Sequence, residues 1–513
     1  MSAFSRPDSE VLIVGAGPTG LVLALWLTRL GVPVRIIDKA AELGTTSRAM
    51  AVQARTLEFH NQIGIAKAAI DGGVKVQYLN LWVRGKTAAQ VSLWRIGEGI
   101  SPYPFALSFA QDAHERLLID QLAALGVRVE RQTELRHFEQ DTTFVRATLS
   151  RPDGSEEHCT SAFLAGCDGA SSTVREQLRV GFPGGTYTGL FYVADVDADG
   201  EACDDQLHID LEEADFALVF PLKAKGRVRL IGLIRDLPES DVSQLTFKDV
   251  EAVAVRHLGL SIERVHWFST YRVHHRVANR FRAGRVFLLG DAAHIHSPVG
   301  GQGMNTGIGD AVNLAWKLAL GATEPLLATY ELERIAFARR LVKTTDRVFT
   351  FVTRRGTIAK VVRTRLVPAL LPLLFQSATL RNLWFKTVSQ TGIHYHHSPL
   401  SMGKAGGVRG GDRLPWVEIE PGQDNFARLT SLGWQVHVYG EAADDLRNAC
   451  EALGLPLHCF PWQARMRRAG LKPAALYLIR PDGYVALADT HANPTRLRDY
   501  VQSWVNLGDN SPG

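Results

Sequence analysis

An apolar run at residues 11–14 opens the hydrophobic pattern of the chain and predicts a buried strand. Apolar residues at helical spacing then extend over residues 21–30, and a second strand-like run covers residues 34–37. A glycine-rich segment separates the first strand from the helix. We therefore predict a strand, helix, strand unit at the beginning of the chain.

A similar pattern returns much later. The apolar run at residues 286–289 ends in Gly290-Asp291, and a glycine cluster at residues 300–303 precedes a long helix. That helix has one apolar face, which carries Ile308, Val312, Ala315 and Leu318. Two turns of the nucleotide-binding type are thus predicted, far apart in the chain.

Strand signals dominate the region between these turns. Residues 216–220 and 228–233 are apolar runs separated by a turn at Lys225-Gly226, and residues 187–271 as a whole favour a mostly antiparallel sheet. A shorter strand-like excursion at residues 79–94 is expected to join that sheet.

The chain divides into several predicted domains. The first domain is discontinuous, with residues 1–180 and 276–345, and the sheet domain covers 181–275 with a contribution from 76–104. Residues 346–402 are helical and basic, and a glycine-rich boundary at 403–411 precedes a separate α/β unit that ends at residue 513.

Composition excludes several classes of protein. The 513 residues are 46% hydrophobic and 21% charged, with a net charge of +4, so neither disorder nor nucleic-acid binding is indicated. The five cysteines form no C-x-x-C pair and no export signal is visible, which favours the cytoplasm. The apolar run at 366–375 is half a membrane span and contains two prolines; we expect a packed helical linker, with membrane-surface contact as the alternative.

The segment Gly15-Ala16-Gly17-Pro18-Thr19-Gly20 is a G-x-G-x-x-G motif placed between a strand and a helix, with Asp38 at the end of the second strand. Glycines permit the turn and bring the backbone close to a pyrophosphate, whose charge the helix N-terminus stabilises. Asp38 is predicted to bind a ribose diol and to repel a 2′-phosphate. The motif by itself fits FAD and NAD equally.

Three segments, in this order, resemble the FAD-dependent class A aromatic hydroxylases, the group that includes the p-hydroxybenzoate and phenol hydroxylases. They are the glycine motif, then Cys167-Asp168-Gly169 with Ser172 and Arg175, then Gly290-Asp291 continued by residues 296–305. The resemblance covers at least residues 10–345, and the tail from about residue 405 resembles the C-terminal thioredoxin-like domain of the phenol and polyketide hydroxylases, without its redox cysteines. It implies an α/β fold: a Rossmann-like FAD-binding domain, an inserted substrate sheet, a helical linker and a thioredoxin-like domain.

The resemblance also assigns site residues. Arg48 and Pro298 are expected to act in catalysis, Arg48 by governing flavin movement and Pro298 through its carbonyl. Phe220, Pro221 and Leu222 are candidate substrate contacts, with a plain core role as the alternative. The expected cofactor-binding residues are Gly15, Gly17, Pro18, Thr19, Gly20, Asp38, Lys39, Arg48, Gln111, Asp168, Asp291, Gly301, Gly303, Met304 and Asn305.

The implied function is a monooxygenase reaction. NADPH or NADH would reduce FAD, and a flavin C4a-hydroperoxide formed from molecular oxygen would hydroxylate a small phenolic or polyketide-like aromatic substrate. The alternatives are epoxidation, Baeyer–Villiger oxidation, a pyridine-nucleotide dehydrogenase and a non-catalytic nucleotide-binding protein. No metal site is expected, because His394, His396 and His397 lack carboxylates at useful spacing. Firm membrane association is not expected, and a homodimer stays open.

Overall fold

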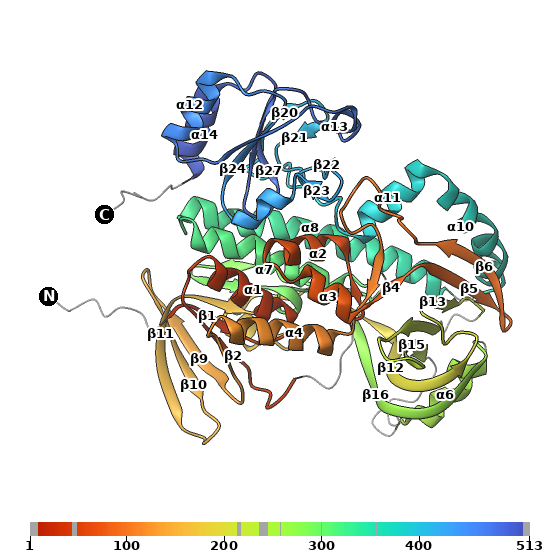
Figure 1. Ribbon diagram of the computed structural model, residues 1–513. Helices are drawn as coiled ribbons and strands as arrows, with labels where there is room; N and C mark the ends of the chain where they lie inside the picture. The colour runs from red at the N-terminus through yellow and green to blue at the C-terminus, as the bar shows by residue number, and fades with distance from the viewer. Residues whose placement is uncertain are drawn as a thin grey trace.

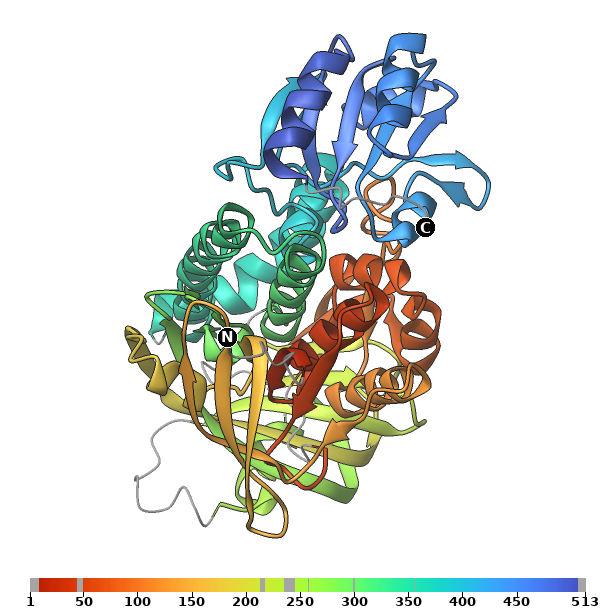
Figure 2. The ribbon, with the colours of Figure 1, turned by 90° about the vertical axis from the view of Figure 1, so that its left-hand side faces the viewer.

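The protein has two large sheets, a bundle of helices and a C-terminal unit (Figure 1). The computed structural model describes residues 9–43, 49–212, 217–234, 245–256, 258–298, 300–354 and 356–505. The C-terminal unit, blue in Figure 2, lies on the helices, and the second large sheet lies at the opposite end.

The first sheet contains the glycine motif. Its central strand β1 (Ser9–Val14) pairs in parallel with β11 (Glu156–Gly166) and with β2 (Val34–Ile37). The strand order is β17 (Arg282–Ala283), β18 (Val286–Leu288), β11, β1, β2 and β8 (Val129–Glu130), with β10 (Val145–Ser150) and β9 (Glu134–Gln140) attached to β11. Because β1, β2, β11 and β18 are parallel, the turns that follow them meet at one edge.

Helix α1 (Pro18–Arg29) is buried over residues 20–27 and packs against α4 (Gln111–Ala124) and α7 (Gly303–Ala319). The Leu, Val and Trp side chains of this helix are buried on every side of it, as expected for a helix inside a core. Helix α8 (Glu324–Thr353) packs on α7. The remaining elements of this part are β3 (Ala51–Val52), α2 (Ala54–Gln62), α3 (Ala66–Gly72), β4 (Val74–Val76), β7 (Ala106–Ser108) and α5 (Thr173–Gln177).

The second sheet has eight strands in the order β19-β16-β12-β15-β14-β13-β5-β6. All its pairs are antiparallel except β13 with β5. Strand β19 follows the second glycine-type turn and pairs with β16, so the sheet joins the first part of the molecule there. The bounds are β5 (Tyr78–Val83), β6 (Lys86–Ser92), β12 (Gly184–Gly200), β13 (Leu207–Asp210), β14 (Ala217–Pro221), β15 (Arg227–Ile234), β16 (Leu260–Val277) and β19 (His294–Ile295), with helix α6 (Phe247–Arg256).

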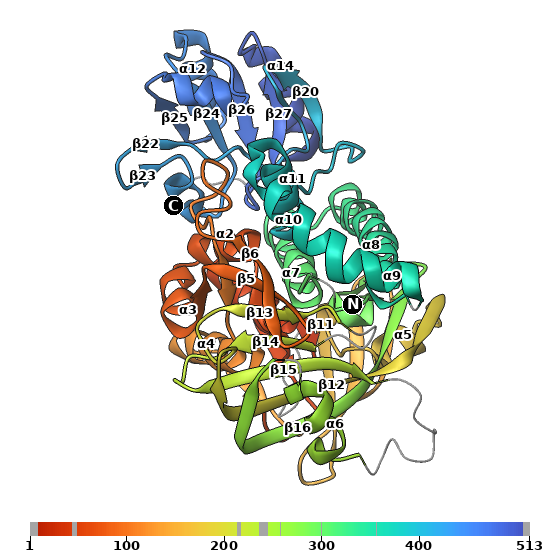
Figure 3. The same cartoon turned by 90° about the vertical axis from the view of Figure 1, so that its right-hand side faces the viewer.

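A helical run connects α8 to the C-terminal unit. It consists of α9 (Thr357–Val361), the π-helical turn η3 (Val362–Leu366), α10 (Val367–Gln376) and α11 (Ala378–Val388). Figure 3 shows this run along one side of the molecule, with α10 next to β6 and α9 next to α8. Within the described residues, no helix is long and apolar enough to cross a membrane.

The C-terminal unit has a six-stranded sheet in the order β21-β20-β27-β26-β24-β25. Its thioredoxin-like character stays a prediction. The bounds are β20 (Met402–Ala405), β21 (Val408–Arg409), β22 (Glu418–Glu420), β23 (Gln423–Asp424), η4 (Ala427–Ser431), β24 (Gln435–Tyr439), α12 (Asp444–Ala452), β25 (Leu457–Phe460), α13 (Ala464–Arg468), β26 (Leu476–Ile479), β27 (Val485–Asp489) and α14 (Pro494–Trp504).

Candidate active site

Three glycines shape the turn between β1 and α1. Gly15 has a φ of +103°, and a Cβ atom there would lie 2.4 Å from the carbonyl oxygen of Cys167. A Cβ atom at Gly20 would lie 2.0 Å from the carbonyl oxygen of Gly15, so both positions require glycine. Gly17 differs, because no heavy atom lies within 4 Å of the place where its Cβ would be.

The space beside Gly17 lies at the N-terminus of α1. Gly17 is the N-cap residue, no side chain caps the helix, and its first turn contains no acidic residue. Pro18 occupies the beginning of the helix, where a missing N–H has no cost. The N–H groups of the first turn and the positive end of the helix dipole therefore face open space, which suits a phosphate group.

Asp38 lies beside the same turn. Its Oδ2 accepts a hydrogen bond from the N–H of Ala16 at 2.7 Å, and its Oδ1 accepts one from the N–H of Ala40 at 2.8 Å. Arg131 Nη1 lies 3.6 Å from Oδ2. These bonds fix the carboxylate next to the glycine motif, while each oxygen keeps a lone pair for a ribose hydroxyl. Lys39 is exposed next to it.

The two turns predicted from distant parts of the sequence meet at Thr19. A Cβ atom at Gly290 would lie 2.7 Å from Thr19 Oγ1, and one at Gly307 would lie 2.2 Å from the same atom. The segment after β18 and helix α7 thus both contact the first turn of α1. Asp291 lies at this junction, in the 3-10 helix η2 (Gly290–Ala292), and its side chain is exposed.

The side chain of Asn305 is fully used within the protein. Its Oδ1 accepts hydrogen bonds from the N–H of Gln53 at 2.9 Å and from Thr56 Oγ1 at 2.7 Å. Its Nδ2 donates to the carbonyl oxygens of Ala51 at 2.8 Å and Gly301 at 2.7 Å. Asn305 therefore fixes the start of α7 against β3 and α2, and can offer a ligand only its backbone.

No side chain caps helix α7, which begins at Gly303. The N–H groups of its first turn, from Gly303 and Met304 onward, are available to a ligand. Gly301 has a φ of +61°, and a Cβ atom there would lie 2.7 Å from the Cβ of Ala51, so glycine is needed for this close approach. The N-termini of α1 and α7 thus provide two positively polarised helix ends in one region.

The carbonyl oxygen of Pro298 accepts a hydrogen bond of 3.0 Å from the N–H of Gly301, which closes a turn before α7. Its second lone pair remains for a ligand. His296 lies next to this turn: its Nδ1 is 2.8 Å from the carbonyl oxygen of Ser297, and its buried Nε2 has no hydrogen-bond partner. Burial lowers the pKa of His296 to about 4, so its ring is neutral near pH 7.

Asp168 has a structural role that the sequence did not separate from cofactor binding. Its Oδ1 accepts from Ser172 Oγ at 2.6 Å and its Oδ2 accepts from the N–H of Val174 at 3.0 Å, at the start of α5. Burial raises the pKa of this carboxyl group. Arg175, from the same segment, donates to the carbonyl of Ala292 at 3.1 Å and so joins it to η2. The role of Asp168 as a cofactor ligand stays a prediction.

Two further predicted site residues are Arg48 and Gln111. Arg48 is outside the described residues. Gln111 is the first residue of α4; its Oε1 accepts from the N–H of Ala49 at 3.2 Å and its Nε2 donates to Glu115 at 2.8 Å. Gln111 therefore holds the chain immediately after Arg48.

The predicted substrate contacts lie at the end of β14. Pro221 is buried, and its carbonyl oxygen accepts a hydrogen bond of 2.8 Å from Ser108 Oγ on β7. Phe220 and Leu222 are partly buried. This end of the second sheet is therefore bonded to the part of the protein that carries the glycine turns.

An aromatic cluster on the same sheet had not been singled out from the sequence. The rings of Phe191 and Tyr271 stack at 5.6 Å, and Tyr187 lies 4.3 Å from Phe349 of α8. Tyr187 donates a hydrogen bond of 2.7 Å to Asp346. Tyr192, the next residue on β12, points to the opposite face and lies in a separate core. Alternation along β12 and β16 was the signal that could have identified the cluster.

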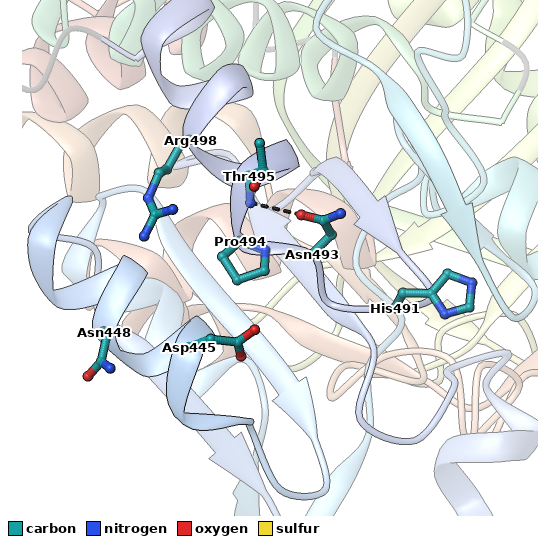
Figure 4. Close-up of a pocket in the computed structure, with 7 residues that line it drawn as sticks. All are labelled: Asp445, Asn448, His491, Asn493, Pro494, Thr495 and Arg498. Carbon is teal, nitrogen blue, oxygen red and sulfur yellow. Dashed lines mark hydrogen bonds between the residues drawn. The ribbon is translucent and has the colours of Figure 1, made fainter.

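A cavity of about 640 Å³ lies in the C-terminal unit, between α12 and α14 (Figure 4). Its lining is polar, and Asn493 is occupied in capping α14 through the N–H of Thr495 at 2.8 Å. None of its residues belongs to the predicted site. The lining residues are Asp445, Asn448, His491, Asn493, Pro494, Thr495 and Arg498.

The residues present fit FAD. The open space at Gly17, the fixed Asp38 carboxylate and the uncapped start of α7 match its pyrophosphate, its ribose and its ring. A site for NAD would need only the turn between β1 and α1. It would give no role to the segment after β18 and to the start of α7, which both contact Thr19. Fold and site together define a flavin-binding oxidoreductase.

Comparison with known proteins gives the family. Residues 8–345 match the FAD binding domain, and residues 409–507 match the C-terminal domain of aromatic-ring hydroxylases. The chain is 34% identical to 6-methylpretetramide 4-monooxygenase of Streptomyces rimosus, over 98% of this chain and 95% of that protein. It is 31% identical to dialkyldecalin synthase of Streptomyces rugosporus, over 93% of this chain and 96% of that protein.

The fold is also found in a solved complex. Aklavinone-11 hydroxylase with FAD and aklavinone superimposes with a TM-score of 0.78 and 25% sequence identity, over 97% of this chain and 99% of that chain. The chain belongs to the FAD-dependent aromatic-ring hydroxylase family and is a flavoprotein monooxygenase. The family resemblance inferred from the sequence is confirmed, and so is the mixed α/β fold with an FAD-binding domain.

Proposed function

We propose that this monooxygenase hydroxylates a phenolic, polyketide-like aromatic compound, with FAD as its bound cofactor and NADPH or NADH and O2 as co-substrates. The observation that carries the proposal is the junction at Thr19, where Gly290 and Gly307 bring the N-termini of α1 and α7 together. Similarity to 6-methylpretetramide 4-monooxygenase over nearly the whole chain supports the substrate class.

The chain's own groups would hold the cofactor in three places. The N–H groups at the start of α1 bind the pyrophosphate beside Gly17, and Asp38 accepts hydrogen bonds from the adenosine ribose. Asp291 accepts one from the ribityl chain, and Gln111, which accepts the N–H of Ala49, is a second candidate for that chain. Thr19 acts through packing, since its hydroxyl lies between two glycines.

When bound, FAD supplies hydride acceptance from the nicotinamide and activation of O2. The uncapped N–H groups at Gly303 and Met304, with the helix dipole of α7, would stabilise negative charge on a reduced flavin. The Pro298 carbonyl, fixed by its hydrogen bond to Gly301, would accept a hydrogen bond from a reacting hydroxyl group.

The second sheet would form the wall opposite the ring. The aromatic cluster between this sheet and α8, with Phe191 and Phe349 almost fully buried, would keep water out from that side. Exclusion of water matters because activated oxygen otherwise returns to solution as hydrogen peroxide. Pro221 and its neighbours form the edge of this wall.

The test is a screen of phenols and polycyclic aromatics for stimulation of NAD(P)H oxidation by the holoenzyme, with product mass. The proposal expects at least one compound to stimulate oxidation and to gain a single oxygen atom. Gain of oxygen with a ring expansion or an epoxide would instead indicate Baeyer–Villiger or epoxidase chemistry. Oxidation that no aromatic stimulates would contradict the proposal.

A second candidate is a synthase reaction without net oxidation, because one relative is named a synthase and not a monooxygenase. In that case FAD would be bound, but a substrate would turn over without consumption of NAD(P)H or O2. An oxygen electrode separates the two candidates directly.

We also propose a cytoplasmic location. No disulfide joins any of the five cysteines, and three of them are buried, as expected for a protein folded in a reducing compartment.

A further inference from the structure

The helical run α9–α11, with the end of α8, carries most of the large hydrophobic side chains that are exposed in the described part of the chain. Among the described residues, ten of the fifteen large hydrophobic side chains that are exposed lie between residues 348 and 383. Ile358 is 83% exposed, Leu383 is 62% exposed and Leu373 is 58% exposed. The ten are Val348, Phe351, Ile358, Val361, Leu366, Leu370, Leu373, Leu374, Leu380 and Leu383. We call this surface the leucine face.

Helix α10 is apolar on two sides. Val367, Leu371 and Phe375 pack against the cluster formed by β5 and β6. Leu366, Leu370, Leu373 and Leu374 recur at i, i+4, i+7 and i+8, which places them on one outward stripe. Packing within the chain therefore explains the inner side, while the outer side is an apolar patch of the kind that marks an interaction surface. Figure 3 shows α10 and α9 at the outside of the molecule.

The charge of this segment is one-sided. No Asp or Glu occurs between Asp346 and Asp412, whereas ten Lys and Arg residues do. The segment thus carries +10, and since the whole chain carries +4, the remainder carries 4 − 10 = −6. Arg347, Arg354, Lys360, Arg365 and Lys386 are exposed next to the leucine face.

This positive charge decides whether a second copy of the chain or a lipid surface covers the leucine face. A two-fold interface between copies of the leucine face would bring like charges together, because such an interface pairs the same patch with itself. Apolar side chains flanked by Lys and Arg on surface helices match the interface of a membrane that contains anionic lipids. We propose that the leucine face docks on an anionic lipid surface, with α9–α11 lying in its plane and no part of these helices crossing it.

The docking proposal does not rest on the proposed reaction. Its geometry does place the lipid surface next to β5 and β6 of the second sheet, because α10 packs on β6. A poorly soluble aromatic compound dissolved in the membrane would then lie close to the sheet that we assign to substrate binding.

The experiment is cosedimentation of the FAD-loaded enzyme with vesicles of phosphatidylcholine alone and with a phosphatidylglycerol fraction. We expect binding to the anionic vesicles, and a several-fold decrease in binding when the salt is raised from about 0.1 M to 0.5 M. The double variant Leu373→Ser/Leu383→Ser should lower the partition coefficient about tenfold or more. Lys360→Gln/Arg365→Gln should lower it on anionic vesicles and leave binding to neutral vesicles unchanged.

Matched controls use exposed residues outside the face. Leu125 and Leu332 are 37% and 55% exposed, and the pair Leu125→Ser/Leu332→Ser should bind vesicles like the parent protein. Lys225→Gln/Lys248→Gln, at two exposed lysines outside these helices, serves the same purpose for charge. The spectrum of bound FAD reports that each variant is folded.

Absence of sedimentation with the anionic vesicles would overturn the proposal. So would analytical ultracentrifugation that finds a dimer which Leu373→Ser/Leu383→Ser converts to monomer, because the leucine face would then be an interface between two copies.

Discussion

His294 and Asp310 face each other in the core, with His294 Nε2 2.7 Å from Asp310 Oδ2. The same carboxylate accepts a hydrogen bond from the N–H of Gly290 at 3.0 Å and pairs with Arg334 Nε at 2.6 Å. Asp310 lies on α7, and Gly290 and His294 flank Asp291. The buried carboxylate of Asp310 therefore holds the segment around Asp291, the proposed ribityl-binding residue, against α7.

Asp310→Asn should weaken both folding and FAD binding. The change leaves the Arg334 guanidinium buried without its ion pair, and broken buried pairs cost about 3–5 kcal/mol of stability. Urea unfolding and fluorescence titration with FAD measure the two effects. Asp71→Asn, which removes an exposed pair with Lys67, is the control and should change neither. Unchanged FAD affinity in a folded Asp310→Asn protein would contradict the role given to Asp310.

Gly17→Ala should separate cofactor binding from folding. Because nothing lies within 4 Å of the added Cβ, the apoprotein should unfold at an unchanged denaturant concentration. The methyl group would occupy the space left for the pyrophosphate, and we expect FAD affinity to fall about tenfold or more. Gly433→Ala, where the nearest heavy atom to an added Cβ is 3.9 Å away, is the control. Equal FAD affinity in the two variants would contradict the proposal that the pyrophosphate binds beside Gly17.

Glu333→Gln should destabilise the contact between α8 and the C-terminal unit. Glu333 pairs with Arg480 at 2.8 Å and with Lys317 at 2.9 Å, and all three side chains are fully buried. Loss of the carboxylate leaves Lys317 buried without an ion pair and Arg480 with Asp482 as its remaining partner, so we expect about 3 kcal/mol less stability by urea unfolding.

The control for this ion-pair network is Glu324→Gln. Glu324 pairs with Arg282 on the surface, where its side chain is 78% exposed, and the substitution should have little effect. If Glu333→Gln were as mild as Glu324→Gln, the buried network would not hold the C-terminal unit in place.

Acid should destabilise the protein through buried neutral histidines. Burial lowers the pKa of His437 to about 3, whereas an unfolded histidine has a pKa of about 6.5. Between these values the unfolded chain binds one more proton than the native protein, so stability falls as the pH falls. At pH 5 the contribution of His437 to this loss is about 2 kcal/mol.

The slope of unfolding free energy against pH measures this linkage. His437→Phe should reduce the slope between about pH 6 and pH 4.5 by nearly one proton, whatever it does to absolute stability. His137→Asn, at an exposed position, should leave the slope as it is. An unchanged slope in His437→Phe would mean that this ring takes up its proton over the same pH range in the native protein as in the unfolded chain.

The sequence predicted the regular elements near the glycine turns well, because their signals are local. Strand β2 has the predicted bounds, and α1 begins at Pro18, three residues before the predicted apolar stretch. The start of the helix is determined by Gly17 and Pro18, which an apolar period does not detect.

Long-range partners could not be predicted in the same way. The convergence of Gly290 and Gly307 on Thr19 depends on how the parallel strands bring distant turns to one edge. A sequence motif also does not reveal that the Asn305 side chain is hydrogen-bonded to Gln53 and Thr56. For Asp168 the local spacing to Ser172 was visible, but its role in holding the N-cap residue Ser172 and the N–H of Val174 became clear only from the bonds it accepts.

Incorporation of isotopically labelled oxygen tests the central claim most directly. The FAD-loaded enzyme is supplied with NAD(P)H, 18O2 and an aromatic compound that stimulates NAD(P)H oxidation, and the product is analysed by mass spectrometry. We predict one 18O atom in the product, as a hydroxyl group on the aromatic ring, and none from labelled water. A product that contains no 18O, or a protein that purifies without FAD and does not take it up, would contradict the account.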